Sequence, residues 1–114
     1  TSAIVDGDER RLRELARNLL DNAVRHARAC VSIASRAHGR ICEIVVEDDG
    51  DGVPPQERER IFERFYRRAN DGAGTGLGLA IVRWIARAHE GTVTVEDGAA
   101  GGARFVATIP AHKE

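Results

Sequence analysis

The sequence predicts an α/β fold, a two-layer α/β sandwich in which three helices cover one face of a mixed, mainly antiparallel sheet of about five strands. Two observations favour this class. Two long segments carry apolar residues at helical spacing, and other segments alternate apolar and polar residues as half-buried strands do. With 114 residues the chain can form one hydrophobic core, so we expect residues 1–114 to be a single domain.

Composition excludes several functional classes. The chain has 17 basic and 18 acidic residues and a formal net charge of −1, so no global field attracts nucleic acid. Its only lysine is Lys113, so a phosphate bound by a basic side chain should meet an arginine guanidinium. No apolar stretch approaches the length of about 20 residues that a membrane-spanning helix needs. The chain lacks Met and starts within a pattern, so we expect a piece of a longer protein.

The first predicted helix runs from about Glu9 to Ala27. One continuous apolar stripe marks it: Leu12, Leu15, Ala16, Leu19, Leu20, Ala23 and Ala27. At 100° per residue, Asn18, Asn22 and Arg25 line one edge of that stripe, neither in the core nor fully in water. Asn is a poor helix former. The pair either bonds a neighbouring loop or has a function, and its spacing alone leaves both open.

A hairpin of two strands, 29–36 and 40–47, should follow, with His38-Gly39 as its turn. Alternation places the residues Val31, Ile33, Cys42, Ile44 and Val46 on the face that packs against the helices. Continued by two residues, it puts Asp48 on that buried face. A lone buried carboxylate is costly unless it meets a donor, and a ligand amine would serve. Asp49 and Asp51 should face solvent or the turn.

The same register predicts the state of the two cysteines. It places Cys30 opposite Glu47 and Cys42 opposite Ser35, with the two thiols on opposite faces of the sheet. We therefore expect two free thiols, which indicate a reducing, cytoplasmic setting.

Less regular structure should follow this hairpin. Pro54 to Glu57 is typical of a short helix with Pro in its first turn. Ile61 to Tyr66 gathers three aromatic residues into an amphipathic cluster. Residues 67–74 contain few apolar anchors and two glycines, so we expect a mobile loop that acts as a lid.

A second long helix should begin at the glycine run Gly74 to Leu79 and reach about Ala88. Its expected stripe is Leu77, Ala80, Ile81, Trp84, Ile85 and Ala88. Three glycines at alternate positions weaken a helix start by about 1 kcal/mol each. They suit a start where backbone N–H groups approach an anion. Gly91 should end the helix, and two strands, 92–96 and 103–109, should flank a turn at 97–102.

Three other kinds of site do not fit. A calcium loop starting at Glu47 would have Arg58 where a bidentate Glu is required. The spacing of the glycine run matches neither a dinucleotide fingerprint nor a P-loop. The His and Cys residues show no zinc spacing. His26 stays a candidate because it follows Asn22 and Arg25 near the same helix end.

The order of these features is more specific than any one of them. The chain, from about Val5 to Pro110, resembles the ATP-binding catalytic domain of bacterial sensor histidine kinases. They share a Bergerat-type fold with gyrase, MutL and the ninety-kilodalton heat-shock chaperone. The matching motifs are residues 17–23 (N box), 48–52 (G1 box), 62–65 (F box) and 74–79 (G2 box).

The resemblance implies a role for each motif. Asp48 would accept a hydrogen bond from the adenine amino group, Asn22 would hold Mg²⁺ at the phosphates, and Asn18 would support the phosphate end, so the two asparagines are the catalytic candidates. The implied nucleotide-binding set is Asn18, Asn22, Arg25, His26, Asp48, Gly50, Gly52, Arg67, Gly74, Thr75, Gly76, Leu77, Gly78 and Leu79. Ala103 stands where the family often has Thr, so no hydroxyl is expected there.

The resemblance also implies the reaction, with ATP and Mg²⁺ as cofactors. The domain would supply the γ-phosphate for autophosphorylation of a histidine on a separate dimerisation domain, in cis or in trans, and a response regulator would be an indirect partner. His89-Glu90 imitates part of an acceptor motif but ends a helix, so we expect it to be structural. The domain itself would be a cytoplasmic monomer, and its parent a homodimer anchored in the plasma membrane.

Three alternatives stay open. A slow ATPase of the gyrase or chaperone type would need a Glu where this chain has Asn18. A protein-serine kinase of the anti-sigma type shares the fold and also lacks that Glu. A nucleotide sensor would bind ATP without any transfer.

Overall fold

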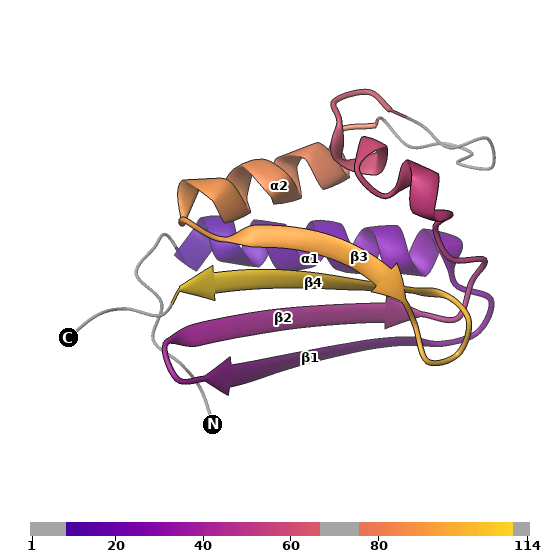
Figure 1. Cartoon of the computed structure of the whole chain (residues 1–114), viewed down its shortest axis with the longest axis horizontal. Coiled ribbons are helices and arrows are strands. Elements are labelled where there is room, and N and C mark those ends of the chain that lie inside the picture. Colours follow the sequence, from indigo (N-terminus) through magenta and orange to yellow (C-terminus); the bar gives the residue numbers. More distant parts are fainter. Residues whose placement is uncertain (1–8, 67–75, 111–114) are drawn as a thin grey trace.

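The computed structural model describes residues 9–66 and 76–110. The elements in chain order are α1 (Glu9–His26), β1 (Val31–His38), β2 (Ile41–Asp48), the 3-10 turns η1 (Pro55–Glu57) and η2 (Arg60–Phe62), α2 (Gly78–Ala88), β3 (Thr92–Asp97) and β4 (Ala103–Pro110). Figure 1 shows the two α-helices side by side over the sheet. The expected lid, residues 67–74, lies outside the described residues.

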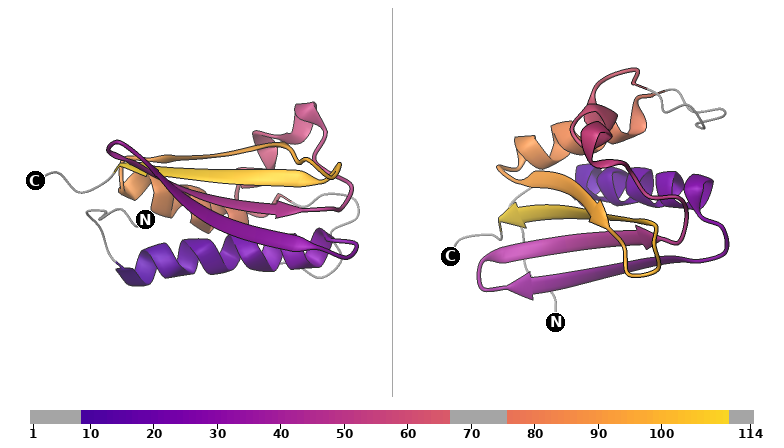
Figure 2. Two further views of the ribbon diagram at one scale, coloured as in Figure 1. Left: turned by 90° about the horizontal axis from the view of Figure 1, so that it is seen from below. Right: turned by 45° about the vertical axis from the view of Figure 1, so that its right-hand side comes forward.

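The predicted fold class is confirmed. The described strands form one sheet in the order β1-β2-β4-β3, and all neighbouring strands are antiparallel. Both α-helices lie on the same face of this sheet (Figure 2). Four strands are described, against about five expected, and the third expected helix takes the form of the two 3-10 turns. Pro55 stands in the first turn of η1, as predicted.

The hairpin register differs from the prediction by two residues. Cys42 pairs with Ala37 instead of Ser35, and Glu47 pairs with Ser32 instead of Cys30. The reason is the turn, which consists of Gly39 and Arg40. Gly39 takes the first turn position with φ +58, where a two-residue hairpin turn favours glycine. A shift of two residues keeps every side chain on its predicted face, and both cysteines are free thiols. Ile33, which was expected to pack against the helices, is 51% exposed.

The core lies between the helices and the inner face of the sheet. Val46 on β2 and Val95 on β3 both pair with Phe105 on β4. The fully buried large side chains are Phe105, Leu15, Leu19, Ile85, Ile109, Val46 and Val82. Burial of each contributes about 1.5–3 kcal/mol. The predicted stripe of α1 is confirmed at its centre, where Leu15, Leu19 and Ala23 are buried.

The predicted stripe of α2 is partly wrong. Ile85 is buried as expected, but Trp84 is 59% exposed, and Val82 and Ala86 are buried in its place. The helix carries two overlapping apolar stripes. α2 packs against α1 and against the sheet, and Val82 and Ala86 belong to the core between them, whereas the indole of Trp84 is left in solvent.

Candidate functional site

Asp48 ends β2 on the inner face of the sheet, as the alternation predicts. It is 4% exposed, and its Oδ1 accepts hydrogen bonds from the backbone N–H of Gly50 at 2.8 Å and of Ala103 at 3.4 Å. Its Oδ2 accepts no hydrogen bond from any described residue. Among the described residues, the protein therefore bonds one carboxylate oxygen and not the other.

Glycines allow the backbone to pack closely around this carboxylate. A Cβ on Gly102 would lie 2.1 Å from the backbone oxygen of Asp48, and one on Gly50 would lie 2.1 Å from that of His26. A Cβ on Gly52 would lie 3.3 Å from the oxygen of Gly101. The turn is thus wedged between the end of α1 and the start of β4, and any side chain at Gly50 or Gly102 would push Asp48 out of place.

Asp49 does more than the sequence indicated. It accepts hydrogen bonds from the N–H groups of Arg28 at 2.8 Å and Ala29 at 3.1 Å. The bonds from Ala29 and then Cys30 hold its pKa below the usual 3.8 of an aspartate. Asp51 forms an exposed ion pair with Arg28 at 2.6 Å. Asp49 therefore ties the turn to the segment between α1 and β1, a contact that left no pattern in the sequence.

The polar edge of α1 is graded in depth. Asn18 is half-buried, and its Nδ2 donates to the backbone oxygen of Glu14 at 3.0 Å. Asn22 is 5% exposed, deeper than the edge position predicted for it, and its amide makes no hydrogen bond with a described residue. His26 is half-buried and Arg25 exposed. Its buried place on this edge of α1 keeps Asn22 a candidate for ligand binding.

The start of α2 lies beside Asn18. A Cβ on Gly78 would lie 3.4 Å from Asn18 Oδ1. Gly76 has φ +79, and its oxygen accepts the N–H of Phe65 at 2.8 Å. Among the described residues no side chain caps α2 at Leu77, and a helix N-terminus of this kind is a place where anions bind. Leu79 packs on the core. Three further predicted residues, Arg67, Gly74 and Thr75, lie outside the described residues.

Because successive side chains of a strand alternate between faces, Glu47 points to the opposite face of the sheet from Asp48. Glu47 accepts from Arg104 at 3.0 Å and from the N–H of Ala99 at 2.6 Å, and Arg104 also pairs with Glu96. The Arg104 guanidinium, followed by that N–H, lowers the pKa of Glu47 below its usual 4.5. These contacts hold the β3–β4 turn, and with it the start of β4, against Asp48.

The described ranges, 9–66 and 76–110, lack two further features. They contain no group of three or more His, Cys, Asp or Glu side chains arranged to hold a metal ion. They also contain no helix with the length and apolarity that crossing a bilayer requires.

Comparison with known proteins agrees with this geometry. Residues 7–113 match the family described as histidine kinase-, DNA gyrase B-, and HSP90-like ATPase. Sensor histidine kinase CpxA of Escherichia coli (strain K12) is 38% identical over 111 residues, which cover 94% of this chain and 24% of that protein. The chain therefore spans about a quarter of the length of this relative.

Two solved structures are similar throughout. Full-length ShkA in complex with AMPPNP has a TM-score of 0.86 and 35% identity, covering 99% of this chain and 24% of that one. The ATP-binding domain of PrrB from Mycobacterium tuberculosis has a TM-score of 0.81 and 36% identity, covering 99% of this chain and 76% of that one. The chain belongs to the histidine kinase-, DNA gyrase B- and HSP90-like ATPase family, within which it is similar to the sensor histidine kinases.

Proposed function

We propose that this domain binds ATP with Mg²⁺ and supplies the γ-phosphate for autophosphorylation of a histidine on a separate dimerisation domain of a two-component sensor kinase. One observation carries the proposal. The residues predicted to meet adenine and phosphate lie at the two ends of one edge of α1. Asp48 approaches the end near His26, and the uncapped start of α2 approaches Asn18.

The adenine end rests on Asp48. Gly50 and Ala103 hold Oδ1, so the carboxylate plane is set before any ligand arrives. Oδ2 would then accept a hydrogen bond from the exocyclic amino group of adenine without any rearrangement of the Asp48 side chain, which lowers the entropic cost of binding. Guanine carries a carbonyl at the equivalent position, and a carboxylate repels that oxygen.

The phosphate end rests on the asparagines and on backbone donors. Mg²⁺ prefers oxygen ligands and usually keeps several waters with one or two protein ligands and phosphate oxygens, which the available amide of Asn22 fits. Asn18 would support the phosphates beside it, while Gly76, Leu77 and Gly78 would donate N–H groups. Arg67 would reach phosphate oxygens. Arg25 and His26, which the resemblance also assigns to the phosphates, lie toward the Asp48 end of α1 and would contact the nucleotide there. The pocket would be completed by Gly74, Thr75, Leu79, Gly50 and Gly52.

Phosphoryl transfer needs few further groups from this domain. Phosphoryl transfer depends mainly on positioning and on neutralisation of phosphate charge, and bound Mg²⁺ supplies most of the latter. Asn18 cannot act as a general base for water, because an amide does not take up a proton and its Nδ2 is bonded to Glu14. This favours transfer to an acceptor over hydrolysis.

The acceptor is expected elsewhere in the parent protein. His89 follows α2, and its Nδ1 lies 2.8 Å from the backbone oxygen of Ile85, so it serves the helix end. The proposal therefore includes a His-bearing dimerisation domain, a response regulator downstream, and a homodimeric parent anchored in a membrane with this domain in the cytoplasm.

Binding is tested by titration with a non-hydrolysable ATP analogue, with and without Mg²⁺. Asp48→Asn should weaken binding by about tenfold or more, because it removes a buried charged acceptor. Asn22→Ala should remove the dependence on Mg²⁺. Asp51→Asn is the matched control, since Asp51 is exposed, and should bind as the wild type does. Absence of saturable binding, or wild-type affinity in Asp48→Asn, contradicts the proposal.

Transfer is tested by mixing the domain with its parent's dimerisation domain and labelled ATP. An acid-labile, base-stable phosphate on that domain supports a histidine kinase. An acid-stable phosphate on a serine would indicate the anti-sigma type of kinase instead. Steady ATP hydrolysis by the isolated domain, abolished by Asn22→Ala, would indicate the ATPase.

A further inference from the structure

The β3–β4 turn, residues 98–102, lies at the same end of the sheet as the end of β2 (Figure 1). Its last residue, Gly102, has no room for a side chain beside Asp48. The next residue, Ala103, donates its N–H to Oδ1 of Asp48 at 3.4 Å. The position of this turn therefore affects where the Asp48 carboxylate lies and how it is oriented.

The turn has no apolar anchor of its own. Its sequence is Gly-Ala-Ala-Gly-Gly, and Ala99, Ala100 and Gly101 are exposed. Two backbone hydrogen bonds close it internally, from Gly98 to Gly102 at 2.8 Å and from Gly101 to Gly98 at 3.2 Å. A glycine-rich backbone with few buried contacts opens easily, so the turn depends on neighbouring segments to keep its place.

Glu47 holds the turn from the outer face of the sheet. Its Oε2 accepts a hydrogen bond from the N–H of Ala99 at 2.6 Å, and its Oε1 accepts one from Nε of Arg104 at 3.0 Å. Hydrogen bonds to a carboxylate are roughly twice as strong as those between neutral groups. Since Glu47 and Asp48 are consecutive and point to opposite faces, these two carboxylates bind the turn and the start of β4 from both sides.

Arg58 holds the turn at its start. Its Nη2 donates to Oδ1 of Asp97, the last residue of β3, at 2.7 Å, and its Nε donates to the backbone oxygen of Val53 at 3.0 Å. Val53 is buried, and Asp97 pairs with Ala103 across the β3–β4 ladder. The planar guanidinium thus joins the buried segment that follows Asp48 to the strand end opposite Ala103.

We propose that Glu47 and Arg58 are positioning residues for adenine recognition. Arg58 holds the start of the β3–β4 turn, and Glu47 holds its tip. The turn keeps the N–H of Ala103 on Oδ1 of Asp48, so that Oδ2 is directed to the adenine amino group. Neither Glu47 nor Arg58 belongs to the nucleotide-binding set, so both act through Asp48. This inference rests on the proposed function, which assigns Asp48 to adenine.

Hydrogen exchange in the ligand-free domain tests the geometry first. In the wild type the amide of Ala103 should exchange slowly, because it is buried and bonded to Asp48. Glu47→Ala and Arg58→Ala should each speed its exchange by about tenfold. The amide of Ala107, in the middle of β4, reports global unfolding and should change much less. An equal acceleration of both amides would mean a loss of overall stability alone and would contradict the proposal.

Calorimetry then measures the consequence for binding. Glu47→Ala and Arg58→Ala should each weaken the binding of adenosine by about tenfold, because Asp48 is no longer held at its angle. Their affinity for tripolyphosphate with Mg²⁺ should match that of the wild type, because this ligand meets only the proposed phosphate end. In an Asp48→Asn background neither change should weaken adenosine binding further, since both act through that carboxylate. Glu47→Gln keeps one acceptor oxygen and should give an intermediate loss.

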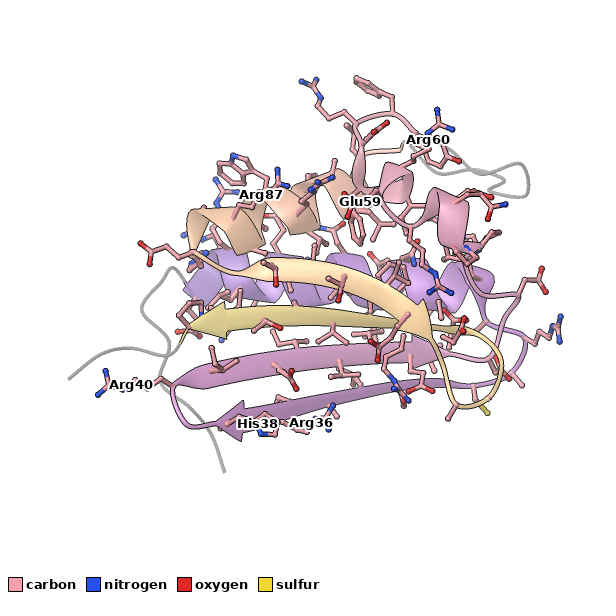
Figure 3. The ribbon with its side chains drawn as sticks, in the orientation of Figure 1. Arg36, His38, Arg40, Glu59, Arg60 and Arg87 are labelled. Atoms are coloured by element: carbon pink, nitrogen blue, oxygen red, sulfur yellow. The ribbon has the colours of Figure 1, made fainter. Side chains whose placement is uncertain are left out.

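Glu43→Ala is the matched control for Glu47. Glu43 lies four residues earlier on the same face of β2, and its side chain is 25% exposed, against 20% for Glu47. Its carboxylate lies 3.7 Å from Arg36 and 3.6 Å from His38. Figure 3 shows both partners on β1 toward the hairpin, away from the β3–β4 turn. This variant should leave the exchange of Ala103 and the binding of adenosine unchanged.

Arg83→Ala is the matched control for Arg58. The two arginines are exposed to a similar extent, and each pairs with an exposed carboxylate, which for Arg83 is that of Glu59 at 3.3 Å. Glu59 lies beside α2 (Figure 3), so this ion pair does not hold the β3–β4 turn. The variant should bind adenosine as the wild type does.

Two further results would overturn the proposal. One is unchanged exchange of Ala103 in either variant, which would show that the contact removed does not hold the turn. The other is unchanged affinity for adenosine despite faster exchange, which would leave both residues a structural role alone. A wild-type domain that binds neither adenosine nor the ATP analogue would instead contradict the proposed function, and the positioning role with it.

Discussion

The two ends of the candidate site are held in different ways. At the Asp48 end, Oδ1 accepts two backbone N–H groups, and the neighbouring Asp49 accepts those of Arg28 and Ala29. At the other end, within the described residues, one backbone bond joins Phe65 to Gly76, and Gly78 lies against Asn18.

This difference matches the two kinds of recognition proposed. A base is recognised by an acceptor at a set position and angle, so the protein gains by fixing the carboxylate during folding. Phosphates are recognised by charge and by backbone donors, and among the described residues no side chain caps the start of α2. Within the described residues, backbone bonds hold the Asp48 end, and the proposed ligand would add contacts at the other end.

The largest effect is expected from Gly102→Ala at the Asp48 end. The new Cβ would lie 2.1 Å from the backbone oxygen and 2.6 Å from the Oδ1 of Asp48. Backbone on both sides must shift, so we expect a loss of about 3 kcal/mol in the free energy of unfolding, measured in urea. Because Asp48 moves, affinity for adenosine and for the ATP analogue should both fall.

Gly39→Asn is the control for that substitution. Gly39 has no atom within 4 Å of its would-be Cβ, and Asn tolerates its φ of +58. Unfolding and binding should stay close to those of the wild type. Equal losses in the two variants would show that Gly102 is not wedged against Asp48, and the contrast between the two ends would disappear.

A smaller effect on stability, but a selective one on binding, is expected from Gly76→Ala. Its φ of +79 disfavours any side chain, and the Cβ would lie 2.7 Å from the Cα of Phe65. We expect a cost of about 2 kcal/mol. Affinity for the ATP analogue should fall, while that for adenosine stays unchanged. Parallel losses for both ligands in calorimetry would contradict the division of the site into two ends.

Sequence patterns predicted the parts of this molecule that depend on the repeat of a helix or on the alternation of a strand. The bounds of α1, the inward direction of Asp48 and the pairing of β3 with β4 all follow from alternation or from the helical repeat. These signals survive because every residue of a strand or a helix repeats the same information about which face is buried.

Features that depend on one contact were not predictable in this way. The hairpin turn lies at Gly39-Arg40 instead of His38-Gly39. Both turns leave every side chain on the same face of the sheet, so alternation cannot distinguish the two registers. On α2 two apolar stripes overlap, and tertiary packing rather than periodicity decides that Val82 is buried and Trp84 exposed. Asp49 binds backbone groups about twenty residues earlier, where no side chain carries a signal.

The smallest effect, and the sharpest in its dependence on pH, is expected from Asp49→Asn. The folded pKa of Asp49 is lowered, so its contribution to stability is present above the usual 3.8 and is lost as the pH falls through the folded pKa. Asn keeps the shape but lacks the charge, so the variant should melt below the wild type at pH 7, with a gap that closes below pH 3.8. Thermal unfolding between pH 3 and pH 7 measures this gap. Asp51→Asn removes only an exposed ion pair and should melt with the wild type throughout. A gap for Asp49→Asn that stays constant with pH would mean that shape alone, and not charge, ties the turn to Arg28 and Ala29.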